Sequence, residues 1–294
     1  MSYRGAKAMV LGAGGFIGRR MLLALERTGA IIQPVTRVAA GDLTQAGAIE
    51  RLIAEWQPDI VFNLAGYGVN PAQRDPGLAE RINAGLPGRI AEALAKTERH
   101  WTGQRLVHTG SALEYGTAAG DLEESTACKP TTLYGQTKLE GTQRLTEAAT
   151  ARNLAAVTAR IFTVYGPGEI EGRLLPTLIA ASRHERDIEL TEGAQRRDFT
   201  YVDDVAEGLL KLGLLKSAPP VLNLATGVLT TVRQFILTAA KVLGIEERRL
   251  KFGAIPTRAE EQGHDPVNID KIRALLGWVP TTTIEQGVRL ATNQ

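Results

Sequence analysis

The sequence predicts an α/β fold in which helices cover both faces of a doubly wound, parallel sheet. Short β-branched apolar runs alternate along the chain with longer amphipathic stretches, and a glycine-rich turn joins the first pair. Alternation of this kind implies right-handed strand–helix–strand crossovers, which make consecutive strands parallel. With 294 residues, the chain is long enough for one large α/β unit that carries a second, smaller lobe.

Six apolar runs are the candidate strands of this sheet. They are nearly continuous rather than alternating, as expected for strands that helices cover on both faces. In chain order they are Ala8–Leu11, Ile31–Val35, Asp59–Leu64, Arg105–Thr109, Ala155–Ile161 and Val221–Leu224. The segment Phe16–Arg27 shows the helical pattern between them, because its apolar residues recur at helical spacing.

The regular alternation weakens after Tyr165, where Gly166, Pro167 and Gly168 form a cluster of turn residues. We therefore predict a main domain of residues 1–164, to which residues 198–227 return. The smaller lobe then consists of residues 165–197 and 228–294. Two lobes imply a cleft, which is where we expect the chemistry to take place.

Composition excludes several classes of function. The formal net charge is +2, so no strong field is directed at nucleic acid or at an anionic membrane. The single cysteine, Cys128, has no partner for an internal disulfide, and no Cys/His run has zinc spacing. Glycines interrupt the apolar run near the N-terminus, which argues against a signal peptide or a membrane span. We expect a cytosolic protein without a metal site.

The segment from Val10 to Gly18 closes the first strand and opens a helix with Phe16 and Ile17. Glycine at position 12 allows a tight turn, and glycine at position 15 lets the backbone approach a pyrophosphate. Gly18 permits close packing of helix on strand, Gly14 completes part of a second glycine pattern, and the helix N-terminus supplies amide donors. A plain tight turn is the alternative. The strand before this turn and the helix after it favour a Rossmann-type dinucleotide site.

The end of the second strand indicates which dinucleotide binds. An acidic residue at this place would hold an adenosine ribose 2′-hydroxyl and repel a 2′-phosphate. Here the strand ends in Val35-Thr36-Arg37, without a carboxylate. Arg37 can stack on adenine and neutralise a 2′-phosphate, although a solvated loop arginine is the alternative. This favours NADP(H), with NAD(H) left open.

Tyr134 and Lys138 lie four residues apart, on one face of a helix if a helix begins there. A neighbouring cation favours the phenolate, so the pair suits proton transfer that accompanies hydride transfer. Ser111 follows the fourth strand at the sheet edge where open α/β sheets bind ligands, and its hydroxyl can hydrogen-bond a reacting carbonyl. The alternative for Tyr134 and Lys138 is a surface helical pair.

Together with motifs along most of the chain, these residues resemble an extended short-chain dehydrogenase/reductase of the NAD(P)-dependent epimerase/dehydratase (nucleotide-sugar) family. The matching segments are Gly12/Gly15/Gly18, Asp42-Leu43, Asn63–Gly66, Asn83, Ser111/Tyr134/Lys138, Arg160–Gly168, Arg196–Ala206 and Leu276–Pro280. The resemblance implies that Ser111, Tyr134 and Lys138 are catalytic. It implies that the cofactor is bound by Gly12, Gly14, Gly15, Phe16, Ile17, Gly18, Arg37, Asp42, Leu43, Leu64, Ala65, Gly66, Asn83, Tyr134, Lys138 and Ile161.

The resemblance also implies a nucleoside diphosphate sugar as substrate, bound by Ser111, Ala112, Thr163, Arg197 and Arg258. The two arginines would hold the diphosphate. A lobe-bridging salt bridge is the alternative for Arg197, and a solvated loop cation is the alternative for Arg258. Thr163 departs from the asparagine that is frequent there in sugar-nucleotide enzymes. The family habit further implies a homodimer through helices at residues 86–94 and 139–148, and no nucleic-acid or membrane partner.

Three reactions compete within such a family. A 4,6-dehydratase would carry an acidic pair directly after Ser111, where this chain has Ala112 and Leu113, and an extended segment would point Glu114 to the other side. Dehydration therefore ranks last. Arg37 without an acidic partner favours an NADPH-dependent reductase of a 4-keto-6-deoxy sugar nucleotide, followed by an epimerase with tightly bound NAD. A dinucleotide sensor without catalytic activity remains the alternative outside the enzymes.

Overall fold

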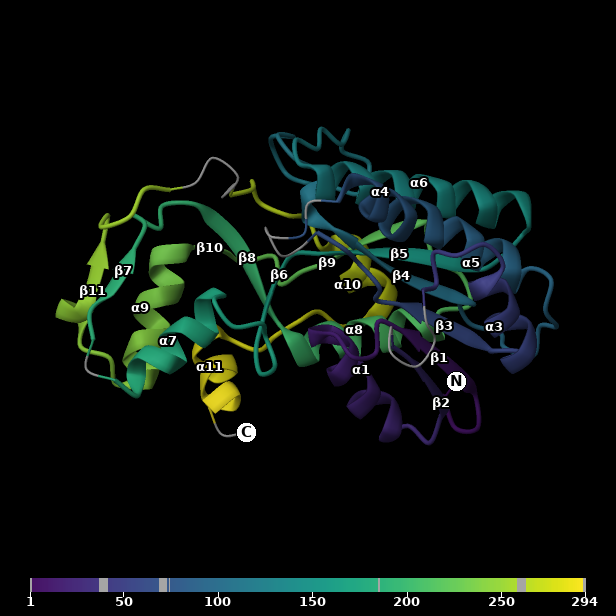
Figure 1. The fold of residues 1–294 in the computed structure, drawn as a ribbon, viewed down its shortest axis with the longest axis horizontal. Coiled ribbons are helices and arrows are strands. Elements are labelled where there is room, and N and C mark those ends of the chain that lie inside the picture. The colour runs from purple at the N-terminus through teal and green to yellow at the C-terminus, as the bar shows by residue number, and fades with distance from the viewer. Residues whose placement is uncertain are drawn as a thin grey trace.

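A parallel sheet organises the larger part of the structure, a computed structural model that describes residues 2–36, 42–68, 73, 75–184, 186–257 and 263–292 (Figure 1). These described residues form a six-stranded sheet in the order β2-β1-β3-β4-β5-β9, with every neighbouring pair parallel. Its strands are β1 (Lys7–Leu11), β2 (Ile31–Val35), β3 (Ile60–Asn63), β4 (Leu106–Ser111), β5 (Ala156–Ile161) and β9 (Val221–Leu224). The predicted fold class is confirmed.

Helices cover both faces of this sheet (Figure 1). On one face, Ala8 and Val10 of β1 share a core with α1 (Phe16–Glu26), α8 (Val202–Leu214) and α10 (Asp270–Leu276). On the other face, Met9 and Leu11 share a core with α3 (Ala48–Trp56), α5 (Leu86–Leu94) and α6 (Leu133–Ala151). This alternation explains the continuous apolar runs, because successive side chains enter opposite cores. The edge strand β2 departs from that pattern, since its Ile31 is exposed.

A smaller lobe lies beside the sheet and has a core of its own (Figure 1). Among the described residues it contains two small sheets, in the orders β10-β8-β6 and β11-β7. The strands are β6 (Thr163–Tyr165), β7 (Ile188–Leu190), β8 (Arg196–Tyr201), β10 (Leu229–Thr231) and β11 (Leu250–Phe252), and the helices are α7 (Leu174–Ser182), α9 (Val232–Leu243) and α11 (Ile284–Thr292).

The chain crosses repeatedly between the two parts. From the small sheet it returns through α8 and β9 to the main sheet, and later through α10. Ile272 of α10 packs in the core of the main sheet, although residue 272 falls within the predicted lobe of residues 228–294. The division into lobes by residue number stays a prediction. Ile17 and Val164 pack against both cores, so the start of α1 lies where the two parts meet.

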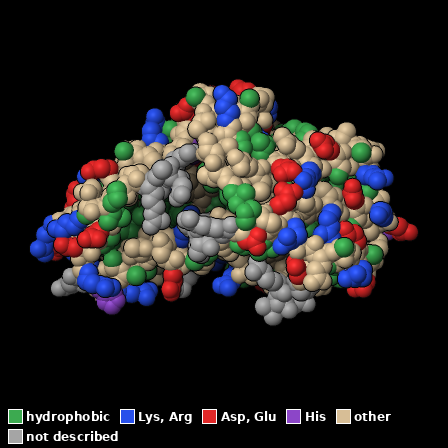
Figure 2. All heavy atoms as spheres, turned by 45° about the horizontal axis from the view of Figure 1, so that its top comes forward, with side chains coloured by type: hydrophobic (Ala, Val, Ile, Leu, Met, Phe, Trp, Pro, Cys, Tyr) green, Lys and Arg blue, Asp and Glu red, His purple; other side chains and the backbone are tan. Residues whose placement is uncertain are grey.

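The remaining elements connect β3 to α5 and β4 to α6. The first connection contains α4 (Pro76–Ala79) and the π-helical turn η1 (Glu80–Gly85), and the second contains the 3₁₀ turn η2 (Ala112–Glu114); a further 3₁₀ turn, η3 (Glu247–Arg249), precedes β11. Among the described residues, none of the helices combines the length and apolar character needed to cross a bilayer. Acidic and basic side chains intermingle over the visible face, and the surface is hollowed between the two parts (Figure 2).

Candidate active site

The turn after β1 has the geometry that its glycines predict. Gly12 has a φ of 78°, a left-handed conformation that favours glycine, and a Cβ there would lie 2.8 Å from the backbone of Leu64. A Cβ at position 18 would lie 2.1 Å from the Gly12 carbonyl oxygen. Real Cβ atoms do not approach that closely, so α1 packs on the turn only because both positions are glycine.

The N-terminus of α1 is open for an anion. Gly15 is the N-cap residue, no side chain caps the helix, and its first turn contains no acidic residue. The first amide N–H groups of a helix have no intrahelical acceptor, and the helix dipole favours negative charge beside them. The residues of the turn therefore fit the pyrophosphate of a dinucleotide.

The predicted adenosine side of the site is described only in part. Arg37 lies outside the described residues. Asp42 is exposed, and its Oδ1 accepts hydrogen bonds from the Thr44 amide at 2.9 Å and the Thr44 hydroxyl at 2.6 Å. Leu43 packs against the core beneath α3. Their contacts with a cofactor, and the preference for NADP(H) that rests on Arg37, stay predictions.

The loop after β3 lies beside the glycine turn and forms the next part of the candidate site. Leu64 lies against the Gly12 turn, and Ala65 donates its amide to the Asn63 side chain at 3.3 Å. Further along this loop, a Cβ at Gly68 would lie 3.5 Å from the Tyr134 ring, so the loop packs directly on that tyrosine. Gly66 lies in the same loop, which connects the glycine turn with the predicted catalytic residues.

Asn83 fixes this loop to α6 from the π-helical turn η1. Its Oδ1 accepts from the Tyr67 amide at 2.9 Å, and its Nδ2 donates to the Tyr67 carbonyl at 2.7 Å and to the Thr137 hydroxyl at 3.0 Å. The side chain is fully buried. Asn83 thus holds the loop against the segment between Tyr134 and Lys138, and direct contact with a cofactor stays a prediction.

The predicted catalytic residues come together at the carboxyl ends of the strands. Ser111 is the last residue of β4, and Tyr134 and Lys138 lie one turn apart on α6, which begins after the N-cap Thr132. Lys138 is 2% exposed and donates its ammonium to the Thr109 carbonyl of β4. The Ser111 side chain forms a hydrogen bond that lowers the pKa of Tyr134. One hydroxyl, one phenol and one ammonium therefore share this edge of the sheet.

The protonation states follow from the surroundings. Burial raises the pKa of the Tyr134 phenol above its ordinary value and the Glu114 carboxylate raises it further, while the Arg173 guanidinium lowers it. Burial lowers the pKa of Lys138 to about 8, and Glu114 opposes that fall. At neutral pH, Tyr134 is therefore a neutral phenol and Lys138 is mostly an ammonium ion.

This corrects one expectation from the sequence. Lys138 was expected to favour the Tyr134 phenolate, but in the structure the lysine ammonium is directed to the Thr109 carbonyl and burial of the phenol dominates. The cation that lowers the pKa of Tyr134 is Arg173, which precedes α7. A neutral phenol is the form that donates a proton, so the site is prepared for donation to a carbonyl oxygen.

The expected direction of Glu114 is also corrected. The segment after Ser111 is not extended but forms the 3₁₀ turn η2, with Ala112 as its first residue. The Glu114 side chain is fully buried and forms an ion pair with Arg160 of β5, at 2.8 Å between Oε2 and Nε. It is therefore engaged inside the protein, and Ala112 and Leu113 still provide no acidic pair for dehydration.

The residues predicted to bind substrate lie where the chain passes from β5 of the main sheet into the smaller lobe. Ile161 ends β5 and is aligned with Ser111 across the sheet, and Thr163 begins β6 two residues later. Arg197 is half-buried on β8, where it is aligned with Thr230 of β10. Arg258 lies outside the described residues. The structure thus brings Ile161 to the same edge as the catalytic residues, and contacts with substrate stay predictions.

Four charged residues were given no part in the site from the sequence, namely Glu114, Arg160, Arg173 and Glu169. Glu114 carries an available signal, because Ser111 and Glu114 have the Ser-x-x-Glu spacing of a capping box, whereas its partner Arg160 lies 46 residues away and carries none. Arg173 and its partner Glu169, at 3.4 Å between Nε and Oε1, carry no such signal, since they lie in an irregular loop. Among the described residues, no group of three or more His, Cys, Asp or Glu side chains is arranged to hold a metal ion.

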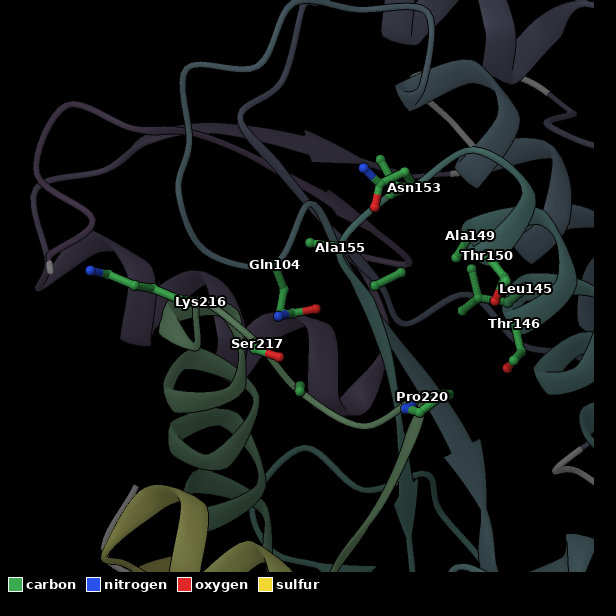
Figure 3. A pocket seen from close by; sticks show the side chains of 13 residues that line it. Gln104, Leu145, Thr146, Ala149, Thr150, Asn153, Ala155, Lys216, Ser217 and Pro220 are labelled. Atoms are coloured by element: carbon green, nitrogen blue, oxygen red, sulfur yellow. The ribbon is translucent and has the colours of Figure 1, made fainter.

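A cavity of about 310 Å³ lies away from this site, between the C-terminal part of α6 and the loop before β9 (Figure 3). Ala155 and Pro220 on its wall lie where β5 and β9 begin. Parallel strands of this class bind ligands at their carboxyl ends. This cavity is at the opposite edge, so it is not the candidate active site.

The open glycine turn, the parallel sheet and the Ser–Tyr–Lys arrangement define an NAD(P)-dependent enzyme with a Rossmann-type domain. Residues 8–225 match the model of the NAD dependent epimerase/dehydratase family. The match spans more than half of the chain, and the protein therefore belongs to this family. Its members that resemble the chain are nucleotide-sugar epimerases, dehydratases and reductases.

Individual relatives agree with this assignment. The chain is 29% identical to dTDP-6-deoxy-L-talose 4-dehydrogenase (NAD(P)(+)) of Kitasatospora kifunensis, over 97% of this chain and 94% of the relative. Two solved structures have the same fold. One is RMD from Pseudomonas aeruginosa complexed with NADPH, with a TM-score of 0.84, 24% identity and 98% of each chain covered. The other is MoeE5 in complex with UDP-glucuronic acid and NAD, with a TM-score of 0.82, 25% identity and 98% of each chain covered.

Proposed function

We propose that the protein is an NADPH-dependent reductase of a 4-keto-6-deoxy sugar attached to a nucleoside diphosphate. The observation that carries this proposal is the shared position of Ser111, a neutral Tyr134 and a charged Lys138 at one edge of the sheet. The relative from Kitasatospora kifunensis is named for oxidation at the same carbon of a 6-deoxy sugar nucleotide, which is this reaction in reverse.

In this mechanism, the Ser111 hydroxyl donates a hydrogen bond to the sugar carbonyl oxygen. Tyr134 transfers its phenolic proton to that oxygen, which becomes the product hydroxyl. Lys138 would hold the nicotinamide ribose, and the Arg173 guanidinium, which lowers the pKa of Tyr134, stabilises the negative charge that develops on the phenol. When bound, NADPH supplies the hydride that the carbonyl carbon receives. The residues proposed to hold the coenzyme are those of the Gly12–Gly18 turn, the loop after β3 and the predicted adenosine side.

Epimerisation is the second candidate, because the family includes epimerases and the Ser–Tyr–Lys arrangement serves both reactions. An epimerase returns the hydride to its own substrate and retains NAD. Dehydration is disfavoured, since the only acidic residue after Ser111 within η2 is engaged by Arg160. A pure dinucleotide sensor is disfavoured as well, because sensing needs no proton donor at Tyr134.

The test mixes purified protein with NADPH and 4-keto-6-deoxy sugars linked to dTDP, GDP, UDP or CDP. Loss of NADPH absorbance in proportion to the alcohol formed supports the reductase. Conversion of one sugar epimer into another without net NADPH loss, by protein that carries NAD through purification, supports the epimerase. Binding of NADPH without either reaction supports the sensor. The Arg197→Ala variant should lose activity only toward substrates that carry the diphosphate.

Homodimer formation and a cytoplasmic location stay part of this proposal. The predicted dimer would use α5 and α6, and α5 packs tightly against α3 and α6 within the same chain. The exposed positions of α6 include Gln143, Arg144 and Glu147, which are polar or charged. A dimer through this face would thus be held by polar contacts, and sedimentation at two salt concentrations tests it.

A further inference from the structure

A buried carboxylate lies directly behind the candidate catalytic serine. Glu114 ends the 3₁₀ turn η2 and is completely buried, as is most of its partner Arg160. Placing a charge in a protein interior is costly unless the charge is paired and its remaining hydrogen bonds are made. This pair therefore needs an explanation, because the proposed reaction assigns it no part.

The contacts of Glu114 lead to the catalytic residues. Oε1 accepts from the Ser111 amide at 2.8 Å and from the Thr142 hydroxyl at 3.2 Å, while Oε2 accepts from Arg160 at 2.8 Å. Thr142 lies one helical turn after Lys138 on α6. One carboxylate thus connects the end of β4, which carries Ser111, to the helix that carries Tyr134 and Lys138.

The same turn orients the serine hydroxyl. Ser111 Oγ accepts the Leu113 amide at 3.1 Å, which completes the capping box with Glu114. An oxygen that accepts this bond still has its own proton to donate. The backbone provides room for the arrangement, because a Cβ at Gly110 would lie 2.6 Å from Glu114 Oε1.

Electrostatics act in the same direction. The Glu114 charge raises the pKa of Lys138 against the effect of burial, and it also raises the pKa of Tyr134. The carboxylate therefore favours an ammonium at position 138 and a neutral phenol at position 134. The titratable or charged groups around Glu114 are Arg160 of β5, Tyr134 and Lys138 of α6, Tyr115 after η2, and Cys128, whose sulfur lies 3.2 Å from Arg160.

We propose that Glu114, held by Arg160, is a positioning residue of the active site that fixes Ser111 against the helix of Tyr134 and Lys138. The inference rests on the proposed function, since it needs these three residues to be catalytic. Glu114 touches neither substrate nor coenzyme in this scheme. It acts through the Ser111 amide, through Thr142 and through its charge.

The test uses the full-length protein and two variants. Glu114→Gln keeps an oxygen acceptor for the Ser111 amide but removes the charge, and the double variant Glu114→Gln with Arg160→Gln also avoids an unpaired buried cation. We expect kcat to fall about tenfold or more in both variants, and the KM for the sugar nucleotide to change less than about twofold. The reason is that the substitutions disturb the orientation of Ser111 and leave the contacts that bind the substrate in place. The alkaline limb of the pH–rate profile should move to lower pH, since Lys138 loses its counter-charge.

A matched control is the Glu124→Gln variant. Glu124 is also a largely buried carboxylate paired with a cation, at 3.0 Å from Lys271, but its side chain bonds the Asn223 amide of β9 rather than Ser111. We expect this variant to lose stability while it retains the wild-type kcat and pH profile. The proposal would be overturned if kcat fell as much in Glu124→Gln as in Glu114→Gln. It would also be overturned if the double variant folded and kept the wild-type kcat and pH profile.

Binding of NADPH, followed by its fluorescence across the same pH range, separates this proposal from the proposed function. If wild-type protein reduces no sugar nucleotide, the proposed function fails, and binding still reports on Glu114. The pH at which NADPH affinity declines should then be lower in the double variant than in wild type. An unchanged binding profile would refute the role of Glu114 independently of any turnover.

Discussion

Glu169 offers a direct test of how the structure controls ionisation. Its side chain is 8% exposed, Oε1 lies 3.4 Å from Arg173, and the buried Oε2 has no hydrogen-bond partner among the described residues. Burial raises the pKa of this carboxyl group from its ordinary value of 4.5 to about 7, against the opposing effect of Arg173. The perturbation is Glu169→Gln, which keeps the shape and removes the ionisable group.

The sign follows from linkage. A carboxyl group with a higher pKa in the folded state binds its proton more tightly there, so its contribution to stability is complete below pH 4.5 and is lost as the pH rises through about 7. The difference of about 2.5 pH units corresponds to about 3 kcal/mol. The free energy of unfolding of Glu169→Gln, relative to that of wild type, should therefore rise by up to about 3 kcal/mol between pH 5 and pH 8. The Tm of the variant should rise by several degrees relative to that of wild type over the same range.

Urea unfolding of both proteins at pH 5, 6, 7 and 8 measures this gain. The control is Glu171→Gln, which removes the same charge from an exposed position in the same loop. Its free energy of unfolding, relative to wild type, should be nearly independent of pH. The same difference between Glu169→Gln and wild type at pH 5 and pH 8, or an equal change in the control, would refute the raised pKa of Glu169.

Three further predictions follow from the site. Tyr134→Phe should lower turnover at least about 100-fold with little change in NADPH affinity, because it removes the proton donor; stopped-flow turnover and fluorescence titration measure the two effects, and normal turnover would reject the assignment. Gly18→Ala should destabilise the fold by about 1–3 kcal/mol and abolish dinucleotide binding, whereas Gly14→Ala, whose Cβ would lie 3.5 Å from Thr36, should unfold like wild type in urea. Cys128 should react slowly with thiol reagents at pH 7, since burial raises its pKa despite the nearby Arg160, and rapid modification of the native protein would contradict this.

Local patterns were sufficient to predict the sheet and to select Ser111, Tyr134 and Lys138, which the structure brings together at one edge of it. All six predicted strands lie in the main sheet, with ends within two residues of those observed, because strands that helices cover on both faces are mostly apolar. The end of β4 was the least well predicted. It continues through polar residues to Ser111 because its ladder with β5 continues to Ile161. The glycine turn and the Tyr134–Lys138 pair were found because each is a short motif within one element.

What the sequence did not predict depends on contacts between distant segments. The partner of Glu114 is 46 residues further along the chain, so the capping spacing alone did not reveal a buried ion pair. The amphipathic pattern of α10 does not say which core its apolar face enters. The burial of Glu169 and the influence of Arg173 on Tyr134 depend on where the segment between β6 and α7 lies in the folded chain, which no local pattern encodes.

The repeated crossing of the chain between its two parts has a practical consequence for dissection of the protein. Neither part is a continuous stretch of sequence, so no single truncation isolates one of them. A protease that cuts at the exposed Lys216–Ser217 segment between α8 and β9 would leave fragments that remain interleaved through both cores. Such nicked protein should migrate as one species in a native gel and separate only after denaturation, and expression of half-molecules should succeed only when both are made together.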